Sequence, residues 1–189
     1  MRLFSEQGFS GTSVAQIEAA AGLAPGAGGL YHHFTSKEAV LAAGIERHLA
    51  RLNALRDLRL VLGDLGDLRA ELTVTARYIL AELDNEAELL RIMASEARRQ
   101  PRLLTDAVEL LVGSTYADLG GWLAQRAEVP VSPSQADAIC AVGLGALLSS
   151  RLLPTVFGIS SPPVEDETLV ATWVTMMIRL LSEPVGTAD

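Results

Sequence analysis

The chain has 189 residues, of which 49% are hydrophobic and 20% are charged, and this composition excludes an intrinsically disordered protein. Cys140 is the only cysteine, which excludes an internal disulfide framework and fits a reducing, cytoplasmic compartment. The longest uncharged stretches, residues 19–36 and 138–150, are interrupted or too short for the ~20 apolar residues of a membrane span. The first residues lack a signal-peptide pattern, so we expect a cytoplasmic protein with no membrane partner.

The net charge of −8 is unevenly distributed along the chain. Residues 1–51 carry four basic and four acidic side chains, whereas residues 52–189 carry 11 arginines against 19 acids. An acidic surface repels nucleic acid, so any contact with DNA is expected from the first 50 or so residues. This difference predicts two domains, 1–51 and 52–189.

Short helices are predicted in the N-terminal segment. Residues 2–9 resemble the end of a helix that stops at Gly8, and Ser13 with Gln16 forms a capping-box pattern that opens a helix to Ala21. Pro25 suits the first position of the next helix, which carries the apolar stripe of Leu30, Tyr31 and Phe34. Residue 36, a serine, is a suitable cap for a long helix that reaches about residue 60.

The acidic remainder is predicted to be helical throughout. Amphipathic stretches span 68–83, 86–98 and 101–127, and an apolar helix spans 134–157 after a proline-containing break. The last helix begins with acidic residues near 165 and ends before Pro184. Alternating strand patterns and repeats are not evident, so the predicted fold class is all-α.

Two short helices joined by a glycine-containing turn, with a third helix across them, are typical of a helix-turn-helix. The residues that match go beyond this general pattern. They are Leu3-Phe4, Gly8-Phe9, Thr12-Ser13-Val14, Ile17, Ala21-Gly22-Leu23, Leu30-Tyr31-His32-His33-Phe34 and Ser36-Lys37-Glu38. About 45 residues thus resemble the DNA-binding region of the TetR family of bacterial regulators, and Tyr-x-x-Phe-x-x-Lys-Glu is the most specific part.

The resemblance implies a role for individual residues. Thr12 and Ser13 would lie near a phosphate, the segment from Pro25 to His33 would hold the recognition helix, and Tyr31 and Lys37 would each contact a phosphate. Val14, Ile17, Leu30 and Phe34 would form the small core between the two helices. The expected DNA-binding residues are Thr12, Ser13, Pro25, Gly26, Ala27, Gly28, Tyr31, His32 and Lys37.

The chain departs from the family pattern in two places. Three residues, Ala27-Gly28-Gly29, separate Gly26 from Leu30, where the family usually has one. This excess of two residues lengthens the turn or changes where the helix begins. The first helix is also shorter than is usual in the family, so it is expected to be truncated.

Sites for metals, nucleotides and catalysis are not indicated. His32 and His33 are adjacent and point apart on a helix, and the glycines at 26–29 lack the Lys-Ser/Thr ending of a phosphate loop. The acidic residues Glu82, Asp84, Glu86 and Glu88 are expected to be a solvated helix boundary, and Cys140 a small core residue. We therefore expect no cofactor, no metal and no catalytic residues.

The last two helices are expected to form a homodimer interface. The penultimate helix has a face of small residues, and the last helix has an apolar stripe, and two such helices from each subunit can form a four-helix interface. These residues are Ala138, Ala141, Gly145, Ser149, Val170, Val174, Met177 and Leu181.

A small-molecule effector is expected to bind in the acidic helical domain. Large side chains on different predicted helices can converge on one cavity, although each of them can equally fill the core. The expected effector-binding residues are Tyr78, Met93, Tyr116, Trp122 and Phe157. Few charges lie near these residues, so the effector is expected to be apolar or weakly polar. If the effector carries an acidic group, Arg77 or Arg151 is the expected partner of that group.

The resemblance to the TetR family implies a ligand-responsive transcriptional regulator, and the usual behaviour of that family implies a repressor. Its N-terminal helix-turn-helix domain would bind double-stranded operator DNA, and the larger helical domain would bind the effector and the second subunit. Two alternatives remain open: a helical small-molecule-binding protein with weak or lost DNA binding, and an enzyme that uses the internal pocket.

Overall fold

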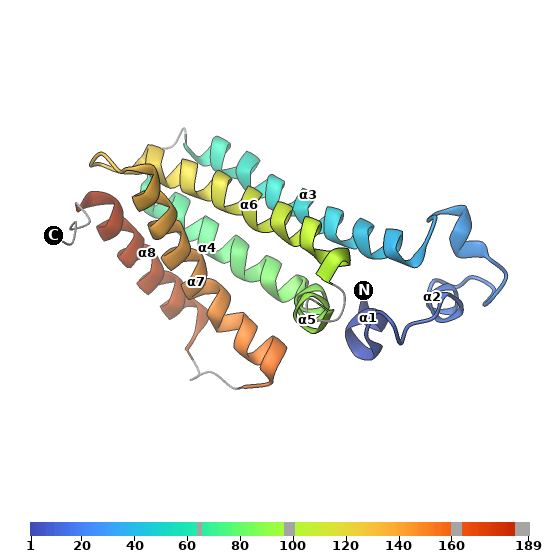
Figure 1. Cartoon of the computed structure of the whole chain (residues 1–189). Helices are drawn as coiled ribbons and strands as arrows, with labels where there is room; N and C mark the ends of the chain where they lie inside the picture. Colours follow the sequence, from blue (N-terminus) through green and yellow to red (C-terminus); the bar gives the residue numbers. More distant parts are fainter. Residues whose placement is uncertain (64–65, 97–100, 160–163, 184–189) are drawn as a thin grey trace. The chain divides into compact units, whose positions relative to one another are not determined.

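The computed structural model describes residues 1–63, 66–96, 101–159 and 164–183, and within these ranges the regular elements are helical (Figure 1). No strand occurs in the described ranges, as the all-α prediction requires. The elements, in chain order, are α1 Arg2–Gln7, α2 Val14–Ala20, the 3₁₀-helix η1 Gly29–His32, α3 Lys37–Gly63, α4 Leu68–Asn85, α5 Ala87–Glu96, α6 Pro101–Arg126, α7 Pro133–Phe157 and α8 Asp166–Ser182.

The chain divides into two compact units. Unit 1 comprises Met1–Ala50 and Asn85–Leu110, and unit 2 comprises Arg51–Asp84 and Leu111–Asp189. The helices α3 and α6 each have residues in both units. The expected division at residue 51 remains a prediction for the functional domains.

Helix α2 begins as the capping box predicts. The Ser13 hydroxyl accepts the backbone N–H of Gln16 at 3.2 Å, and the Gln16 side-chain oxygen accepts the backbone N–H of Ser13 at 2.7 Å. Two otherwise unpaired donors of the first turn are satisfied in this way. The helix ends at Ala20, just before Gly22, whose φ of 75° is left-handed.

The element after Pro25 differs from the expectation. Residues 25–28 form a turn, and the helix begins only at Gly29 and is a four-residue 3₁₀-helix. Gly26 and Gly28 have φ values of 76° and 78°, a region that non-glycine residues rarely adopt. The prediction that Pro25 opens the helix is therefore wrong, because the longer glycine segment is used to make a left-handed turn.

The core of unit 1 joins the N-terminal segment to α3 and α5. The rings of Phe4 and Phe9 lie 5.3 Å apart, and they pack with Leu41, Ile45, Leu89 and Ile92. The backbone N–H of Phe9 donates to the Glu96 carboxylate at 3.1 Å. Leu30 is buried as expected, whereas Val14, Ile17 and Phe34 are half-buried.

The core of unit 2 contains the contact between α7 and α8, which lie side by side (Figure 1). The α8 residues Val170, Val174, Met177 and Leu181 are at most 3% exposed. They pack inside the protomer, so the prediction that this stripe faces a second subunit is wrong. Helical periodicity indicates that a stripe of residues is buried, but it does not indicate which helix or subunit covers the stripe.

Helix α7 is the one described helix that is long and apolar enough to span a membrane by length and composition. Its inward face carries Ile139, Cys140, Leu144 and Leu147, all buried within unit 2. A core helix of a soluble protein has the same composition, so this helix is weak evidence of a membrane segment.

Candidate functional site

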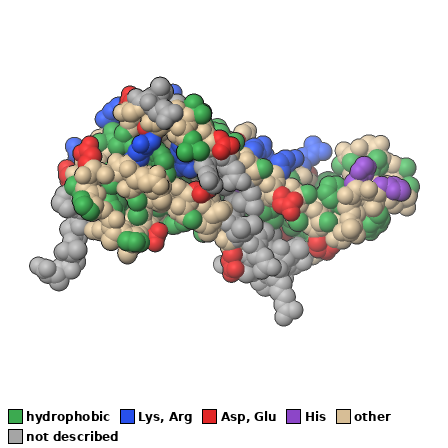
Figure 2. All heavy atoms as spheres, turned by 90° about the horizontal axis from the view of Figure 1, so that it is seen from above, with side chains coloured by type: hydrophobic (Ala, Val, Ile, Leu, Met, Phe, Trp, Pro, Cys, Tyr) green, Lys and Arg blue, Asp and Glu red, His purple; other side chains and the backbone are tan. Residues whose placement is uncertain are grey.

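Exposed side chains gather in and around η1 in unit 1. Tyr31 is 57% exposed, and His32 and His33 are exposed beside it. Figure 2 shows histidine side chains as a purple patch on the surface. Leu30, immediately before them, is buried and anchors η1 to the core. The surface therefore presents an aromatic hydroxyl and imidazoles, which suit contacts with phosphates and base edges.

The turn before η1 is also on the surface. Pro25, Gly26 and Ala27 are exposed and Gly28 is half-buried. Ser13 is exposed as well, and its backbone and side chain are engaged in the capping box. Of the nine expected DNA-binding residues, Pro25, Gly26, Ala27 and Gly28 thus lie in the turn before η1, Tyr31 and His32 lie in η1, and Ser13 lies at the start of α2.

Thr12 and Lys37 have internal partners. Thr12 is 1% exposed, and its hydroxyl lies within hydrogen-bond distance of the carbonyl oxygens of Leu3 and Gly8, at 3.1 and 2.8 Å. The Lys37 ammonium donates to the carbonyl oxygens of Phe9 and Thr12 at 2.7 and 2.9 Å. It also lies 4.3 Å from the centroid of the Phe9 ring. These contacts hold the loop between α1 and α2. An ammonium has three donors, so one remains for a phosphate.

Glu18 on α2 is a residue that the sequence reasoning missed. It is fully buried, and its carboxylate accepts the backbone N–H groups of Gly26 and Leu30. The sequence does contain a feature that indicates its burial: Glu18 is an acidic residue in an alanine-rich helix, and it lies on the same helix face as apolar residues. An unpaired buried carboxylate is costly, so such a residue must have local donors.

A hollow of about 480 Å³ lies between α3 and α6 in unit 2. Its volume is in the range that small-molecule sites occupy. Its polar groups come from Arg59, Asp118, Trp122, Gln125 and Arg126. Gly63 and Gly121, which have no side chains, also line it.

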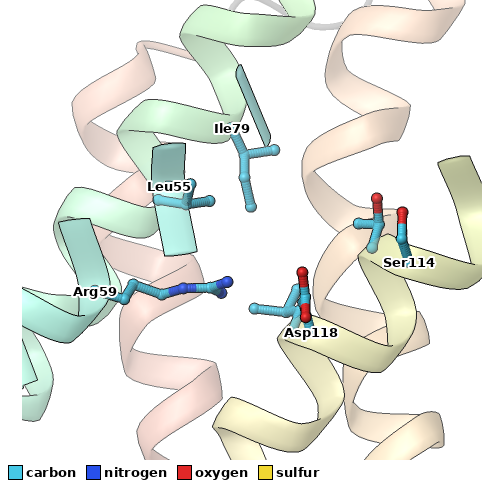
Figure 3. A pocket seen from close by; sticks show the side chains of 7 residues that line it. Leu55, Arg59, Ile79, Ser114 and Asp118 are labelled. Atoms are coloured by element: carbon cyan, nitrogen blue, oxygen red, sulfur yellow. The ribbon is translucent and has the colours of Figure 1, made fainter. Parts of the chain in front are cut away.

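A second, more enclosed cavity of about 30 Å³ lies among α3, α4 and α6. This is room for about one or two waters. Figure 3 shows the guanidinium of Arg59 extending toward Asp118, with Leu55, Ile79 and Ser114 around them. Arg59 and Asp118 line both this cavity and the larger hollow, so the two spaces share their charged groups.

Hydrogen-bond donors dominate the larger hollow. The guanidinium carbon of Arg59, a residue only 5% exposed, lies 5.1 Å from the centroid of the Trp122 ring, a cation–π geometry. The indole N–H of Trp122 is buried and has no hydrogen-bond partner among the described residues. Arg126 is paired with the buried Glu71 at 3.0 Å. The hollow can therefore offer donors to a molecule that carries acceptors.

The five expected effector residues are not brought together. Trp122 lines the hollow, whereas Phe157 is 67% exposed and Met93 packs against the core of unit 1. The Tyr78 hydroxyl donates to the carbonyl oxygen of Arg51 at 2.6 Å, and burial raises its pKa. Tyr116 is half-buried on α6.

The two arginines expected to bind an acidic effector instead form salt bridges with acidic side chains of unit 2. Arg77 pairs with Glu167 at 2.7 Å, and Arg151 binds both Asp84 and Asp166. The hydrogen bond that Arg151 donates to the Asp166 carboxylate, together with the bond to Asp84, raises the pKa of Arg151. Arg59 and Arg126, which the sequence did not single out, line the hollow instead.

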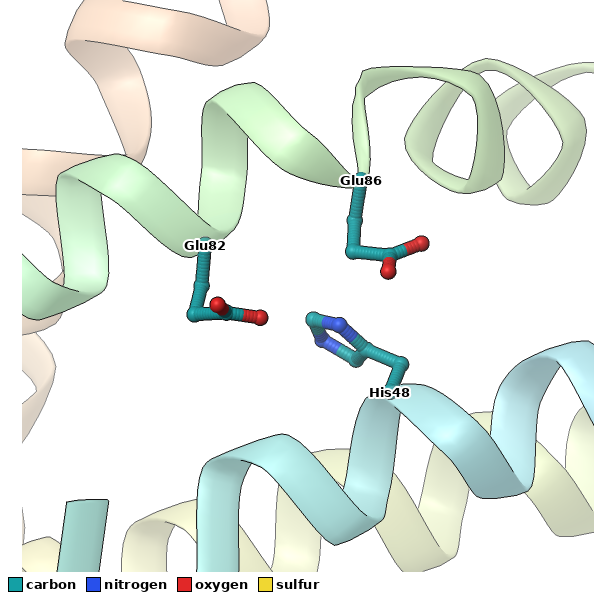
Figure 4. A group of neighbouring side chains, drawn as sticks. All are labelled: His48, Glu82 and Glu86. Atoms are coloured by element: carbon teal, nitrogen blue, oxygen red, sulfur yellow. The ribbon is translucent and has the colours of Figure 1, made fainter. Parts of the chain in front are cut away.

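The acidic segment around residue 84 is partly buried. Glu82 and Glu86 are 7% and 4% exposed, whereas Asp84 is exposed, so the expectation of a fully solvated boundary is wrong. Glu82 pairs with Arg51 at 3.3 Å within unit 2. In unit 1 the His48 ring and the Glu86 carboxylate face each other, with ligand atoms within 4.8 Å (Figure 4). The buried carboxylate of Glu82 is thus offset by the charge of Arg51.

Comparison with known proteins identifies the N-terminal segment. Residues 1–43 match the family model of bacterial regulatory proteins of the tetR family. A crystal structure of a TetR-family transcriptional regulator from Pectobacterium atrosepticum is 22% identical, covers 95% of this chain and 86% of its own, and has a TM-score of 0.48. No curated protein matches the chain.

The matched region contains α1, α2, η1 and the start of α3, which together form the helix-turn-helix described above. Proteins of this family bind DNA to control transcription and are not enzymes. The N-terminal segment is therefore similar to the DNA-binding domains of the TetR family, and this match indicates that the chain is a DNA-binding regulator of transcription.

Proposed function

We propose that this regulator is a cytoplasmic homodimeric repressor that leaves its operator when a small molecule binds unit 2. The exposed surface of η1 is the observation that carries the DNA-binding part of this proposal. Tyr31, His32 and His33 emerge directly after the buried anchor Leu30. A helix-turn-helix dimer reads two half-sites about one DNA turn, roughly 34 Å, apart.

In this proposal the DNA-contacting surface comprises Ser13, the turn from Pro25 to Gly28, and η1. Tyr31 donates its hydroxyl to a phosphate, and His32 faces the groove or the backbone. Lys37 contributes its charge, and its third donor, to a phosphate while it holds the loop before α2. Thr12 supports the loop from inside, because its side chain is buried.

The outward face of α7 supports the proposed homodimer. Ala138, Ala141, Gly145 and Ser149 are all exposed, and nothing described lies within 4 Å of a Cβ built on Gly145. Small residues allow helices to approach closely across a twofold axis. On α8 the exposed Ala171, Thr172 and Thr175 and the half-buried Met176 border a shallow hollow. We expect these residues, and not the buried stripe, to be the part of α8 that contacts the second subunit.

The hollow beside Trp122 supports the proposed effector site. Trp122 contributes an aromatic ring to its lining, and the indole N–H and two guanidinium groups are donors. We expect a small, mainly apolar molecule that carries hydrogen-bond acceptors. Helix α3, which supplies Arg59 to this hollow, also supplies Lys37 to the DNA-binding unit, so a shift of this helix on binding would alter both.

The test starts from DNA that the purified protein selects from random oligonucleotides. Binding is measured by gel shift at stated salt concentrations, because phosphate contacts make affinity salt-dependent. Wild-type protein is expected to select a twofold-symmetric sequence, and Tyr31→Phe is expected to weaken binding to every sequence without changing the selected bases. If no sequence is selected while small molecules still bind unit 2, the protein is a ligand-binding protein and the proposal fails.

The effector part is tested with the same DNA and a panel of small molecules. A molecule that releases wild-type protein is expected to lose its effect on Trp122→Phe, which removes the indole N–H and keeps an aromatic ring. Phe157→Leu is the matched control, because Phe157 is exposed and lies outside the lining of the hollow. Equal release of both variants would place the effector site elsewhere.

A further inference from the structure

The carboxylate of Glu18 bridges α2 and the segment that leads into η1. One oxygen accepts the backbone N–H of Gly26 at 2.6 Å, and the other accepts the backbone N–H of Leu30 at 3.0 Å. The residue is 0% exposed. Both oxygens of a buried charge are thus used to hold one piece of backbone, and hydrogen bonds to an ionised acceptor are stronger than neutral ones.

The N–H of Leu23 donates to the Glu18 carbonyl oxygen at 2.8 Å just before the turn, and within the turn the Glu18 carboxylate supplies the attachment to α2 among the described hydrogen bonds. Gly26 and Gly28 both have left-handed φ values, and a glycine-rich turn loses much conformational freedom when it is ordered. The other backbone hydrogen bonds described in this turn are Ala27 N–H to the carbonyl of Ala24 at 3.2 Å and Tyr31 N–H to that of Gly28 at 3.0 Å. Both are local, so they shape the turn but do not attach it to α2.

The two attachment points lie at the start of the turn and at the start of η1. Leu30 is held twice, by its backbone N–H and by its side chain, which is 3% exposed. The next residue, Tyr31, is 57% exposed. The carboxylate therefore fixes the point at which the chain passes from the core to the exposed surface.

We propose that Glu18 is a positioning residue for DNA recognition. By holding Gly26 and Leu30, the carboxylate fixes the position of η1. It therefore determines how the side chains of Tyr31 and His32 are directed toward the DNA. This inference rests on the proposed DNA-contacting surface, and it assigns to Glu18 the task of keeping the longer turn of this chain in one conformation. Glu18 itself touches no DNA, because it is buried.

Variants at Glu18 test this proposal by comparing specific with non-specific binding. Glu18→Ala removes both acceptors, and Glu18→Gln keeps the size and one acceptor oxygen. The matched control is Glu6→Gln, which removes the same charge from an exposed position on α1. All four proteins are titrated with selected DNA and with unrelated DNA at several salt concentrations, and their helical content is measured by circular dichroism.

The expected result is a loss of selectivity. Glu18→Ala lowers affinity for selected DNA at least tenfold and changes affinity for unrelated DNA less than twofold, with Glu18→Gln between it and the wild type. The salt dependence stays the same, because phosphate contacts are retained. Equal loss for selected and unrelated DNA in folded Glu18→Gln would mean that the carboxylate only stabilises the fold, and would overturn the proposal.

Amide hydrogen exchange gives a second measurement that needs no DNA. In the wild-type protein and in Glu6→Gln the amides of Gly26 and Leu30 are expected to be protected, and in Glu18→Gln at least one of them exchanges at least tenfold faster. Unchanged protection of both amides would overturn the proposal even if the variant bound DNA poorly. Protected amides in a wild-type protein that selects no DNA would instead reject the proposed function.

Discussion

Trp173 of α8 donates its indole N–H to the carbonyl oxygen of Gly143 of α7 at 2.8 Å, and both residues are buried. A Cβ built on Gly143 would lie 3.0 Å from the sulfur of Met177 and 3.6 Å from the Trp173 ring. The absence of a side chain at residue 143 therefore lets the indole reach the backbone of the neighbouring helix. The contact fixes α8 against α7 within unit 2.

Gly143→Val is expected to destabilise the protein. The added methyl groups would press on Met177 and Trp173, and overpacking of this kind costs about 1–3 kcal/mol. Urea unfolding measures the change. Gly113→Val is the matched control, because Gly113 lies in α6 with nothing described within 4 Å of its added Cβ. The same helix-propensity gain applies to both variants, so equal midpoints would contradict this prediction.

Gly145→Arg is expected to produce monomers. Gly145 lies on the exposed small-residue face of α7, and a long charged side chain there would block a close helix contact across the twofold axis. Light scattering measures the mass, and affinity for selected DNA is expected to fall at least tenfold because one half-site is lost. Gly113→Arg adds the same side chain outside α7 and should remain dimeric. A dimeric Gly145→Arg variant would place the interface elsewhere.

Lys37→Ala is expected to weaken binding to all DNA sequences by a similar factor. The ammonium supplies one cationic contact, so its loss should reduce the slope of log affinity against log salt by about one. It also removes the hydrogen bonds to Phe9 and Thr12, so unfolding is measured in parallel. Lys37→Arg keeps the charge and should restore the slope. A Lys37→Ala variant with the wild-type slope would show that Lys37 acts only on the loop.

The thiol of Cys140 is expected to be unreactive in the folded protein. Burial, with a smaller effect of Asp137, raises its pKa from 9.0 to about 11. The folded state thus holds the proton more tightly, so this contribution to stability is complete below pH 9 and is lost as the pH rises toward 11. Unfolding is measured against pH for the wild type and Cys140→Ala. The wild-type protein should lose stability relative to Cys140→Ala over this interval, and parallel curves would contradict the assignment.

Local sequence signals determined most of the helices. The Ser13–Gln16 pair predicted the start of α2, and the capping box at Ser132 and Gln135 shows the same relationship at the start of α7. Such signals are reliable because both partners lie within one turn of the chain. The match of residues 3–38 to a known family likewise indicated DNA binding from the sequence, since it depends on residue types at fixed spacing.

The segment from Pro25 to His32 shows where local signals were insufficient. Pro25 is compatible with a first helical position, but residues 25–28 form a turn and η1 begins at Gly29. This outcome depends on Glu18, which lies eight residues before Gly26 in the chain. The Glu18 carboxylate holds the turn by accepting the backbone N–H of Gly26. A propensity argument considers each segment separately and does not include such a contact.

Tertiary structure alone decided which surfaces are internal. The apolar stripe of α8 is buried against α7 through contacts such as Trp173 with Gly143, whereas the small-residue face of α7 remains exposed. In the same way it placed Arg59 beside Trp122 and engaged Arg77 and Arg151 with surface acids. Residue spacing fixes which side chains share a helix face, but the neighbour of that face depends on how distant helices pack.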